Sequence, residues 1–438
     1  MHTRLLPCLC LAACALPAPA QTPAACRSVR LHVFVEEVLH ANLEAAAQRF
    51  NVTIAEAQVS ISRLLPDPEI HAGVASKELY GPNKPGTPTE YEAGLSWTLE
   101  LGGKRSARIA VAQGEVKKAQ AEFEAFLDEL RATAAGAFAD ALKARLVLER
   151  KQKTMGGFKE LVRLNEIRHA AGDIGGVELA QSRVEARHFE SEVFAAQAEL
   201  KAAEAALAQL LGNVQIPVTA AGSMELPIRP VAAEPLLANA LEHRTALAAA
   251  RRSLDVAESQ RRLAKANRWV DLGLSVGISH TPAVVPTGVD ASGSPFPSPA
   301  FKSNALSFGV SVPIPFSRRQ KGELIQAESA RTQAKLQLQS TEQQTRAEVQ
   351  SAVAQYEAAS SQLAAYRGGI LQDSDKVLEG IQFSYKRGNA SLLEWINAQR
   401  TNHEIHLAYL ETLANHVKAL VALDRISGQH SSLASVEP

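Results

Sequence analysis

The 438-residue chain carries 46 basic and 46 acidic residues, and its pI is near 7.2. This balance disfavours a nucleic-acid partner and a basic membrane-binding surface. Aromatic residues make up only 5% of the chain, while Ala, Glu, Gln, Lys and Leu dominate long stretches. Such a composition is typical of long helices and coiled coils rather than of one large compact core.

Residues 1–20 have the pattern of a secretory signal peptide. Arg4 supplies the positive charge, residues 5–16 the apolar stretch, and residues 18–20 a small-residue cleavage site. In the alternative, a lipoprotein signal, Cys14 is lipidated; we prefer cleavage after residue 20 because the lipoprotein signal would be short. We expect no structural disulfide and no cysteine metal site, because every cysteine lies at this end: Cys8, Cys10, Cys14 and Cys26.

The remaining chain repeats one plan with a period of roughly 200 to 216 residues. The matching segments are Ala55-Glu56-Ala57-Gln58 with Ala257-Glu258-Ser259-Gln260, residues 94–99 with 309–314, Gly172-Asp173 with Gly388-Asn389, and Leu210-Leu211-Gly212 with Ile426-Ser427-Gly428. The sequence therefore predicts a first repeat at residues 31–212, a second at 236–428, and a tail at 429–438. The proline-rich segment 213–235 between them is expected to be a linker without continuous helix.

Each repeat holds two segments in which apolar and small polar residues alternate, the pattern of a strand with one apolar face. A tilted strand needs about 9 to 11 residues to cross a bilayer, and these segments have that length. A soluble sandwich is the alternative, but we expect only four strands, and long loops rich in Gly, Pro and Ser join them. No segment has the long apolar run of a transmembrane helix. The expected strands cover residues 69–79, 90–101, 270–280 and 304–315.

Very long helices are expected to fill the rest of both repeats. At 1.5 Å per residue, the longest would span about 100 Å. Apolar and small residues recur at spacings of three and four from Leu179 to Leu210, which indicates coiled-coil packing. The expected weak points are Gly156-Gly157 and Gly368-Gly369. The helices are predicted at residues 104–170, 177–211, 318–386 and 391–426.

Four membrane strands require an oligomer. Backbone polar groups cannot stay unpaired in hydrocarbon, so a membrane sheet must close on itself. Known outer-membrane barrels have at least about eight strands. Two copies of the chain would give a narrow eight-stranded barrel, and three copies would give twelve strands around a lumen.

Three stretches carry a family resemblance: residues 101–109, residues 172–179, and residues 385–394 followed by Asn397-Ala398-Gln399-Arg400. Over residues 31–428 the chain resembles the TolC-like outer-membrane factor family of tripartite efflux and type I secretion systems. Within that family, the first two stretches are most similar to the heavy-metal branch that includes CzcC.

The resemblance implies a mainly α chain with a β-barrel portion. Three chains would form a twelve-stranded transmembrane barrel, four strands per chain, continued by a twelve-helix periplasmic coiled-coil tube. It implies a homotrimer in the lipid of a Gram-negative outer membrane, working with a periplasmic adaptor and an inner-membrane pump of the resistance-nodulation-division type. The expected role is export of heavy-metal cations, without a cofactor. Export of drugs or of a protein by the type I route is the alternative within this fold.

The same resemblance assigns roles to the two glycine turns. Ala171, Gly172 and Asp173, and in the second repeat Arg387, Gly388 and Asn389, would be the periplasmic tips that meet the adaptor. Two acidic rings close the aperture of the prototype, and they correspond here to Glu394 and Asn397. One carboxylate is kept and one is replaced by an amide. Ala390 stands where the prototype has a gate-bridging arginine, so the closure must differ.

Residues 103–104 resemble the end of a phosphate loop, but Arg105 stands where Ser or Thr is needed, so a basic strand-to-helix entry is preferred. His403 and His406 could share a helix face and hold a metal weakly, although a solvated tube wall is preferred. His71 and His280 lie in expected strands, where lining of a polar lumen is the ordinary interpretation. We therefore expect a passive, gated pore rather than an enzyme.

Two other classes of protein share parts of this pattern. A trimeric adhesin joins a twelve-stranded barrel to a coiled-coil stalk, but it has one C-terminal anchor rather than two separated strand pairs. A periplasmic adaptor has helical hairpins, but its soluble β-domains leave the apolar strand faces unexplained. The export duct is therefore the preferred hypothesis.

Overall fold

A computed structural model describes residues 27–75, 89–214, 218–284, 287–289, 292–293, 295–297, 301–314 and 321–428. The expected signal peptide, Cys14 and the tail at 429–438 lie outside the described residues. The chain forms two compact units, each built from three separate parts of the sequence. We call residues 1–38, 137–224 and 370–414 the helical unit, and residues 39–136, 225–369 and 415–438 the sheet unit.

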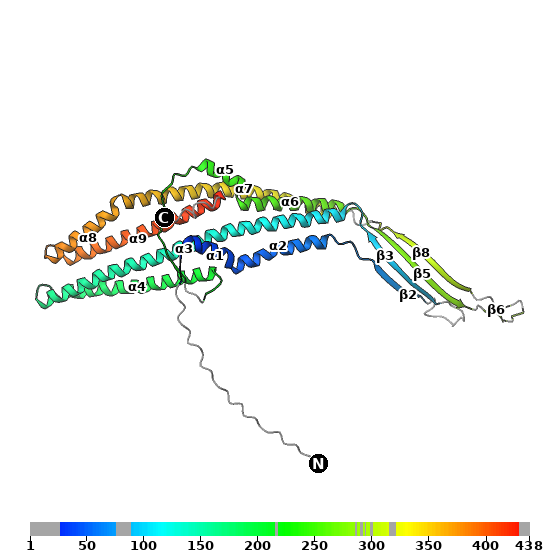
Figure 1. Ribbon diagram of the computed structural model, residues 1–438, viewed down its shortest axis with the longest axis horizontal. Helices are drawn as coiled ribbons and strands as arrows, with labels where there is room; N and C mark the ends of the chain where they lie inside the picture. The colour runs from blue at the N-terminus through cyan, green and yellow to red at the C-terminus, as the bar shows by residue number, and fades with distance from the viewer. Residues whose placement is uncertain are drawn as a thin grey trace, which may run out of the picture. The chain divides into compact units, whose positions relative to one another are not determined.

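The sheet unit contains a four-stranded antiparallel sheet (Figure 1). Its strands are β2 (Glu69–Ala75), β3 (Glu90–Leu99), β5 (Leu272–Val284) and β8 (Phe301–Ser311), in the order β2-β3-β5-β8. They lie where the alternation of residues predicts strands, although β2 has only seven residues. The expectation of four strands in all was wrong, since two short pairs are also present. These are β1 (Arg27–Val29) with β4 (Val218–Ala220), and β6 (Thr287–Val289) with β7 (Pro295–Pro297).

The register gives the sheet one apolar and one polar face. Ile70 pairs with Leu95, which continues through Val276 to Phe308. This apolar row is open to solvent, with Ile70 85% and Phe308 78% exposed. A sheet therefore forms whose apolar side chains find no cover within the described part of the chain.

The two strand histidines lie on opposite faces of this sheet. His71 pairs with Gly94 on the polar face, and a Cβ at Gly94 would lie 2.4 Å from the imidazole ring. His280 pairs with Tyr91 and Asn304, in register with the apolar row, and its Nδ1 lies 2.6 Å from Asn304 Oδ1. His71 therefore lies on the polar face, which the expected lumen lining requires, whereas His280 lies on the apolar face.

Helices precede and follow the strands of the sheet unit along the chain. α2 (Leu43–Ser62) leads toward β2, and the first part of α3 (Lys104–Ala170) follows β3. α5 (Ala233–His243) and α6 (Thr245–Ala266) precede β5, and α7 (Lys321–Ala365) follows β8. Within the described residues of segment 213–235, the start of α5 is the only helical part. The core of this unit is Ala240, Val349, Ala352, Val353, Tyr356, Ala419, Leu423 and Ile426.

The helical unit takes α1 (Leu31–Ala41) up to residue 38 and the second part of α3. Also in it are α4 (Gly176–Leu210), α8 (Leu371–Lys386) and the first part of α9 (Leu392–Ser427). Its core is Phe158, Leu161, Phe189, Tyr385, Leu392, Trp395 and Ile396. Phe158 and Phe189 stack with ring centroids 4.5 Å apart, and they join α3 to α4.

One of the two predicted weak points interrupts a helix. A π-helical turn at Tyr366–Ile370 separates α7 from α8, and Gly369 adopts a φ of 146° there. α3 instead runs unbroken through Gly156 and Gly157, so a weak point at this pair was a wrong prediction. None of the described helices is both long and apolar enough to span a membrane.

Candidate functional site

The turn between α3 and α4 is formed by Ala171, Gly172 and Asp173, all exposed. The Gly172 N–H donates to the His169 carbonyl at 3.0 Å, and the Asp173 N–H donates to the Arg168 carbonyl at 2.8 Å. Gly172 has a φ of 81°, a conformation that glycine adopts without the strain of a side chain. The last carbonyls of α3 are thereby satisfied, and the turn is short and defined.

The turn between α8 and α9 has the same construction. Gly388 has a φ of 79°, and its N–H donates to the Tyr385 carbonyl at 3.0 Å. The Asn389 N–H donates to the Ser384 carbonyl at 2.9 Å. Arg387, Gly388 and Asn389 are exposed, so both turns present backbone and polar side chains to solvent.

Glu394 belongs to a capping arrangement at the start of α9. Its Oε2 accepts from the Ser391 N–H at 2.7 Å and from the Ser391 hydroxyl at 2.9 Å, while its own N–H donates to Ser391 Oγ. These bonds satisfy backbone donors that the first turn of a helix leaves unpaired. They also lower the pKa of the Glu394 carboxyl below its ordinary value. The partner of the Glu394 carboxylate is therefore Ser391 and not one of the nearby basic residues Lys386 and Arg387.

Glu394 and Asn397 are three residues apart on α9 and both are exposed, while Trp395 and Ile396 between them are buried. The helix therefore presents the carboxylate and the amide on the same open face. The buried residues on the other face hold that part of α9 in the core of the helical unit.

Tyr385 ties the second turn to α3. Its hydroxyl donates to Asn165 Oδ1 at 2.7 Å, and its ring stacks on Trp395 with centroids 5.8 Å apart. The guanidinium of Arg168 lies over the same ring at 5.3 Å. Burial raises the pKa of Tyr385, against the opposing effects of Asn165 and Arg168, so the hydroxyl stays protonated. Three helices, α3, α8 and α9, therefore meet at this phenol.

A partly buried polar cluster lies further along the same helices. Asp375 Oδ1 accepts from Asn402 Nδ2 at 2.7 Å, and His406 Nε2 lies 3.0 Å from the same oxygen. Arg150 donates to the Asn402 side chain. Burial raises the pKa of Asp375, but the bonds from Asn402 and His406 outweigh it and leave the pKa below its ordinary value. The cluster joins α3, α8 and α9 by polar contacts.

His403 is buried, with 4% of its surface exposed, so the expected solvated position was wrong for this residue. Its Nδ1 lies 3.0 Å from Thr154 Oγ1 and its Nε2 lies 4.0 Å from the Glu192 carboxylate. Burial lowers the pKa of His403 to about 4, although Glu192 acts in the opposite direction. His406 binds Asp375 instead of sharing a ligand with His403. The described residues contain no cluster of three or more side chains that could hold a metal ion.

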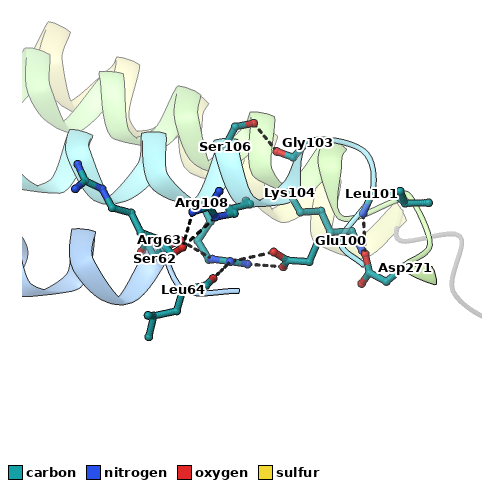
Figure 2. Close-up of polar contacts among 11 residues, drawn as sticks. Ser62, Arg63, Leu64, Glu100, Leu101, Gly103, Lys104, Ser106, Arg108 and Asp271 are labelled. Carbon is teal, nitrogen blue, oxygen red and sulfur yellow. Dashed lines mark hydrogen bonds and ion pairs between the residues drawn. The ribbon is translucent and has the colours of Figure 1, made fainter. Parts of the chain in front are cut away.

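A second set of polar contacts joins the sheet to its helices (Figure 2). Arg108 on α3 forms two bonds to the Glu100 carboxylate, at 2.6 and 3.1 Å. The same guanidinium donates to the carbonyls of Ser62 and Leu64 at 3.2 and 3.0 Å. The hydrogen bond to Glu100 raises the pKa of Arg108. One side chain therefore fixes the end of α2, the end of β3 and the start of α3 together.

The other half of this junction depends on Asp271. It accepts from Lys104 Nζ at 2.8 Å and from the Leu101 N–H at 3.3 Å, which joins the start of β5 to the turn before α3 (Figure 2). Gly102 in that turn has a φ of 70°, and a Cβ there would lie 2.5 Å from Trp269. Lys104 therefore has the structural role expected of a basic residue where a strand enters a helix.

The contacts of Tyr385 and Asp375 join the helices of the helical unit. The contacts of Arg108 and Asp271 join helices of the sheet unit to a sheet with an exposed apolar face. The sequence matches the family described as outer membrane efflux protein over residues 35–213 and 236–429. The chain belongs to this family of outer-membrane transport ducts, which are not enzymes. Family membership and location in the outer membrane of a Gram-negative bacterium are as the sequence predicts.

Among curated proteins, the chain is similar to the cobalt-zinc-cadmium resistance protein CzcC of Cupriavidus metallidurans. They are 27% identical over 393 residues, which cover 89% of the chain and 87% of that protein. The chain is also 24% identical over 297 residues to the outer membrane efflux protein BepC of Brucella suis, covering 68% of the chain and 62% of that protein.

Solved structures share the fold. A crystal structure of CusC has a TM-score of 0.73 at 18% identity, covering 95% of this chain and 96% of that one. The outer membrane channel CmeC of Campylobacter jejuni has a TM-score of 0.75 at 17% identity, covering 92% and 88%. The predicted helix-rich fold of a TolC-like channel is therefore confirmed for the single chain.

Proposed function

We propose that three copies of this chain form the exit duct of a tripartite efflux system that exports heavy-metal cations. A single observation supports the assembly into a duct: the sheet β2-β3-β5-β8 is open, with an exposed apolar face. Strands β2 and β8 each have one neighbour in this sheet, so each leaves one edge unpaired. In hydrocarbon those edges must pair, and pairing between copies supplies the missing neighbours.

Three copies would give twelve strands, with the apolar rows toward lipid and the polar rows toward a lumen. Ser275, Gly277 and Ser307 on the polar face are small, which leaves space inside such a barrel. The long helices would continue it as a twelve-helix periplasmic tube. In this proposal residues 31–212 and 236–428 are the two structural repeats of one protomer.

The two exposed turns, at residues 171–173 and 387–389, are proposed as the contacts with a periplasmic adaptor. An inner-membrane pump of the resistance-nodulation-division type would drive transport through that adaptor. Cysteines placed at Asp173 or Asn389 should crosslink to the adaptor hairpin in cells. A cysteine at Ser292, in the segment between β6 and β7, is the control. Crosslinking from Ser292 alone would reverse the proposed orientation.

The substrate assignment rests on similarity to a cobalt-zinc-cadmium resistance protein. Deleting the gene should lower tolerance to cobalt, zinc or cadmium, and the wild-type gene should restore it. Drug export is the second candidate, because the chain is also similar to BepC, an outer membrane efflux protein whose name specifies no metal. Unchanged metal tolerance with increased drug sensitivity would replace the first candidate by the second.

The experiment that tests the duct itself is conductance in a planar bilayer. A trimer inserted in the bilayer should conduct ions through a single pathway. A stalk-like adhesin would expose its helices at the cell surface, so the helical unit should be open to external protease. In a duct the same helices are protected in intact cells and cut only after the outer membrane is permeabilised.

A further inference from the structure

The junction between sheet and helices exposes both arginine and apolar side chains. Arg63, Arg105 and Arg268 are exposed there. Trp269 is 65% exposed and Leu64 is 64% exposed. The contacts of Gly102 with Trp269 and of Arg105 with the Arg63 carbonyl gather these residues around the turn before α3.

The basic residues of the junction are of two kinds. Lys104 and Arg108 are neutralised by Asp271 and Glu100, at 2.8 and 2.6 Å. Arg105 instead donates from Nε and Nη2 to the Arg63 carbonyl, at 3.0 and 2.8 Å, and a carbonyl carries no net charge.

Arg63 and Arg268 have no carboxylate within ion-pair distance among the described residues. Asp67 and Glu69 are the exposed acidic residues that follow Arg63 most closely in the sequence, and neither forms an ion pair with it. Arg63, Arg105 and Arg268 therefore place three positive charges at the junction that no carboxylate among the described residues neutralises.

The position of these charges along the sheet matters. The apolar row of β3 ends at Leu99, which is 46% exposed, and Leu101 follows it at 38%. If the hydrocarbon core of the membrane ends at Leu99 and Leu101, Trp269 and the three arginines lie at the depth of the lipid headgroups. Tryptophan is enriched at that depth, and basic residues there are attracted to anionic lipid.

We propose that this junction binds the headgroup of an anionic phospholipid in the periplasmic leaflet of the outer membrane. The proposal rests on the proposed function, because it needs the sheet to lie in a membrane. Arg63, Arg105 and Arg268 supply the positive charge, and Trp269 with Leu64 supplies contact with the upper acyl chain. The bond from Arg105 to the Arg63 carbonyl holds two of these residues at the same level.

Native mass spectrometry tests the proposal on the full-length protein in detergent doped with phosphatidylglycerol or with phosphatidylcholine of the same acyl chains. Both lipids contain a phosphate, so a preference for phosphatidylglycerol reports net charge rather than the phosphate group. Wild type should retain phosphatidylglycerol preferentially. Each arginine removed should weaken this preference roughly fivefold, the typical effect of one basic residue at an anionic surface.

The test variant is Arg63→Gln with Arg105→Gln and Arg268→Gln, which should abolish the preference. Arg268→Gln alone should weaken the preference while leaving the bond from Arg105 to the Arg63 carbonyl in place. A matched control removes three exposed charges from the helical unit, Lys159→Gln, Arg187→Gln and Lys201→Gln, and should keep the preference.

Each spectrum also gives the oligomeric state. A trimer without lipid preference, or one whose preference falls equally in the control, would overturn the lipid inference alone. A monomer would contradict the proposed function itself.

Discussion

Glu394 and Ser391 form reciprocal hydrogen bonds at the start of α9. The Glu394 carboxylate accepts from the backbone N–H and the hydroxyl of Ser391, and the Glu394 N–H donates to that hydroxyl oxygen. The pKa of Glu394 in the folded chain is therefore below its unfolded value. Its stabilising contribution is present above the unfolded pKa and is lost as the pH falls through the folded pKa. In a trimer, repulsion among three copies would act against this cap, and the cap would keep the carboxylates ionised at neutral pH.

The first prediction concerns cation block of the aperture. Three ionised Glu394 side chains around a pore should bind multivalent cations, so a trivalent cation added from the periplasmic side should block conductance. Glu394→Gln should raise the half-blocking concentration by roughly tenfold, and Asn397→Asp should lower it. Glu199→Gln, an exposed carboxylate on α4, is the control and should change nothing. Equal block of Glu394→Gln and wild type would remove Glu394 from the pore.

The second prediction concerns the phenol that joins three helices. Tyr385→Phe should destabilise the helical unit by about 1 to 3 kcal/mol, because Asn165 Oδ1 would lose its donor in a buried place. Asn165 Nδ2 has no hydrogen-bond partner among the described residues, so the substitution would leave both polar atoms of this amide without a partner. Urea unfolding followed by tryptophan fluorescence measures the change. Tyr91→Phe, at a half-exposed tyrosine of β3, should shift the midpoint little; equal shifts would discount the Asn165 bond.

The third prediction concerns pH. The pKa of His403 is about 4 in the folded chain and about 6.5 when unfolded. The unfolded chain therefore binds a proton first, and stability falls as the pH drops from about 6.5 to 4, by up to roughly 1.4 kcal/mol per pH unit.

His403→Gln should flatten this dependence of the urea midpoint between pH 7 and pH 4.5. His188→Gln should not, because the His188 side chain is 61% exposed. Arg150, Lys151 and His406 also lower the pKa of His403, while Glu192 raises it. An unchanged slope in His403→Gln would mean that another group, such as the buried His416, controls the pH dependence.

The fourth prediction concerns the turn before α3. Gly102→Ala should destabilise the sheet unit by at least about 1 to 2 kcal/mol, because its φ is positive and Trp269 occupies the space of the new methyl group. Gly136→Ala is the matched control. It lies inside α3 with nothing within 4 Å of an added Cβ, so it should be neutral or stabilising by about 1 kcal/mol. Thermal melting by circular dichroism compares the two, and equal melting temperatures would contradict the packing of Trp269 on Gly102.

Periodicity predicted the secondary structure well, because alternation in β3 and the long breaker-free stretch of α3 are properties of neighbouring residues. The turns at Gly172 and Gly388 were located by the internal repeat and the family resemblance, and both glycines have the positive φ that favours glycine at a helix end. Periodicity did not find β1 and β4, which are three residues each and pair residues that lie 191 positions apart in the sequence, such as Arg27 with Val218.

The side-chain clusters could not be predicted in this way. Asn165, Asp375 and Asn402 look like ordinary polar helix residues, and only the packing of α3, α8 and α9 shows that they bind one another or Tyr385. His403 was misplaced for the same reason, because its spacing from His406 says nothing of the Thr154 hydroxyl on another helix. A polar residue at a core position of the apolar repeat is the signal that could have indicated such partners.

The mass of the purified protein in detergent tests the central claim most directly. An open sheet of four strands with two unpaired edges requires more than one copy in the particle, and the proposed duct predicts three, with the β content of the single chain retained. The predicted result is a trimer of the chain after removal of its signal peptide, stable without any partner protein. A stable monomer that keeps its full β content in lipid would contradict the account.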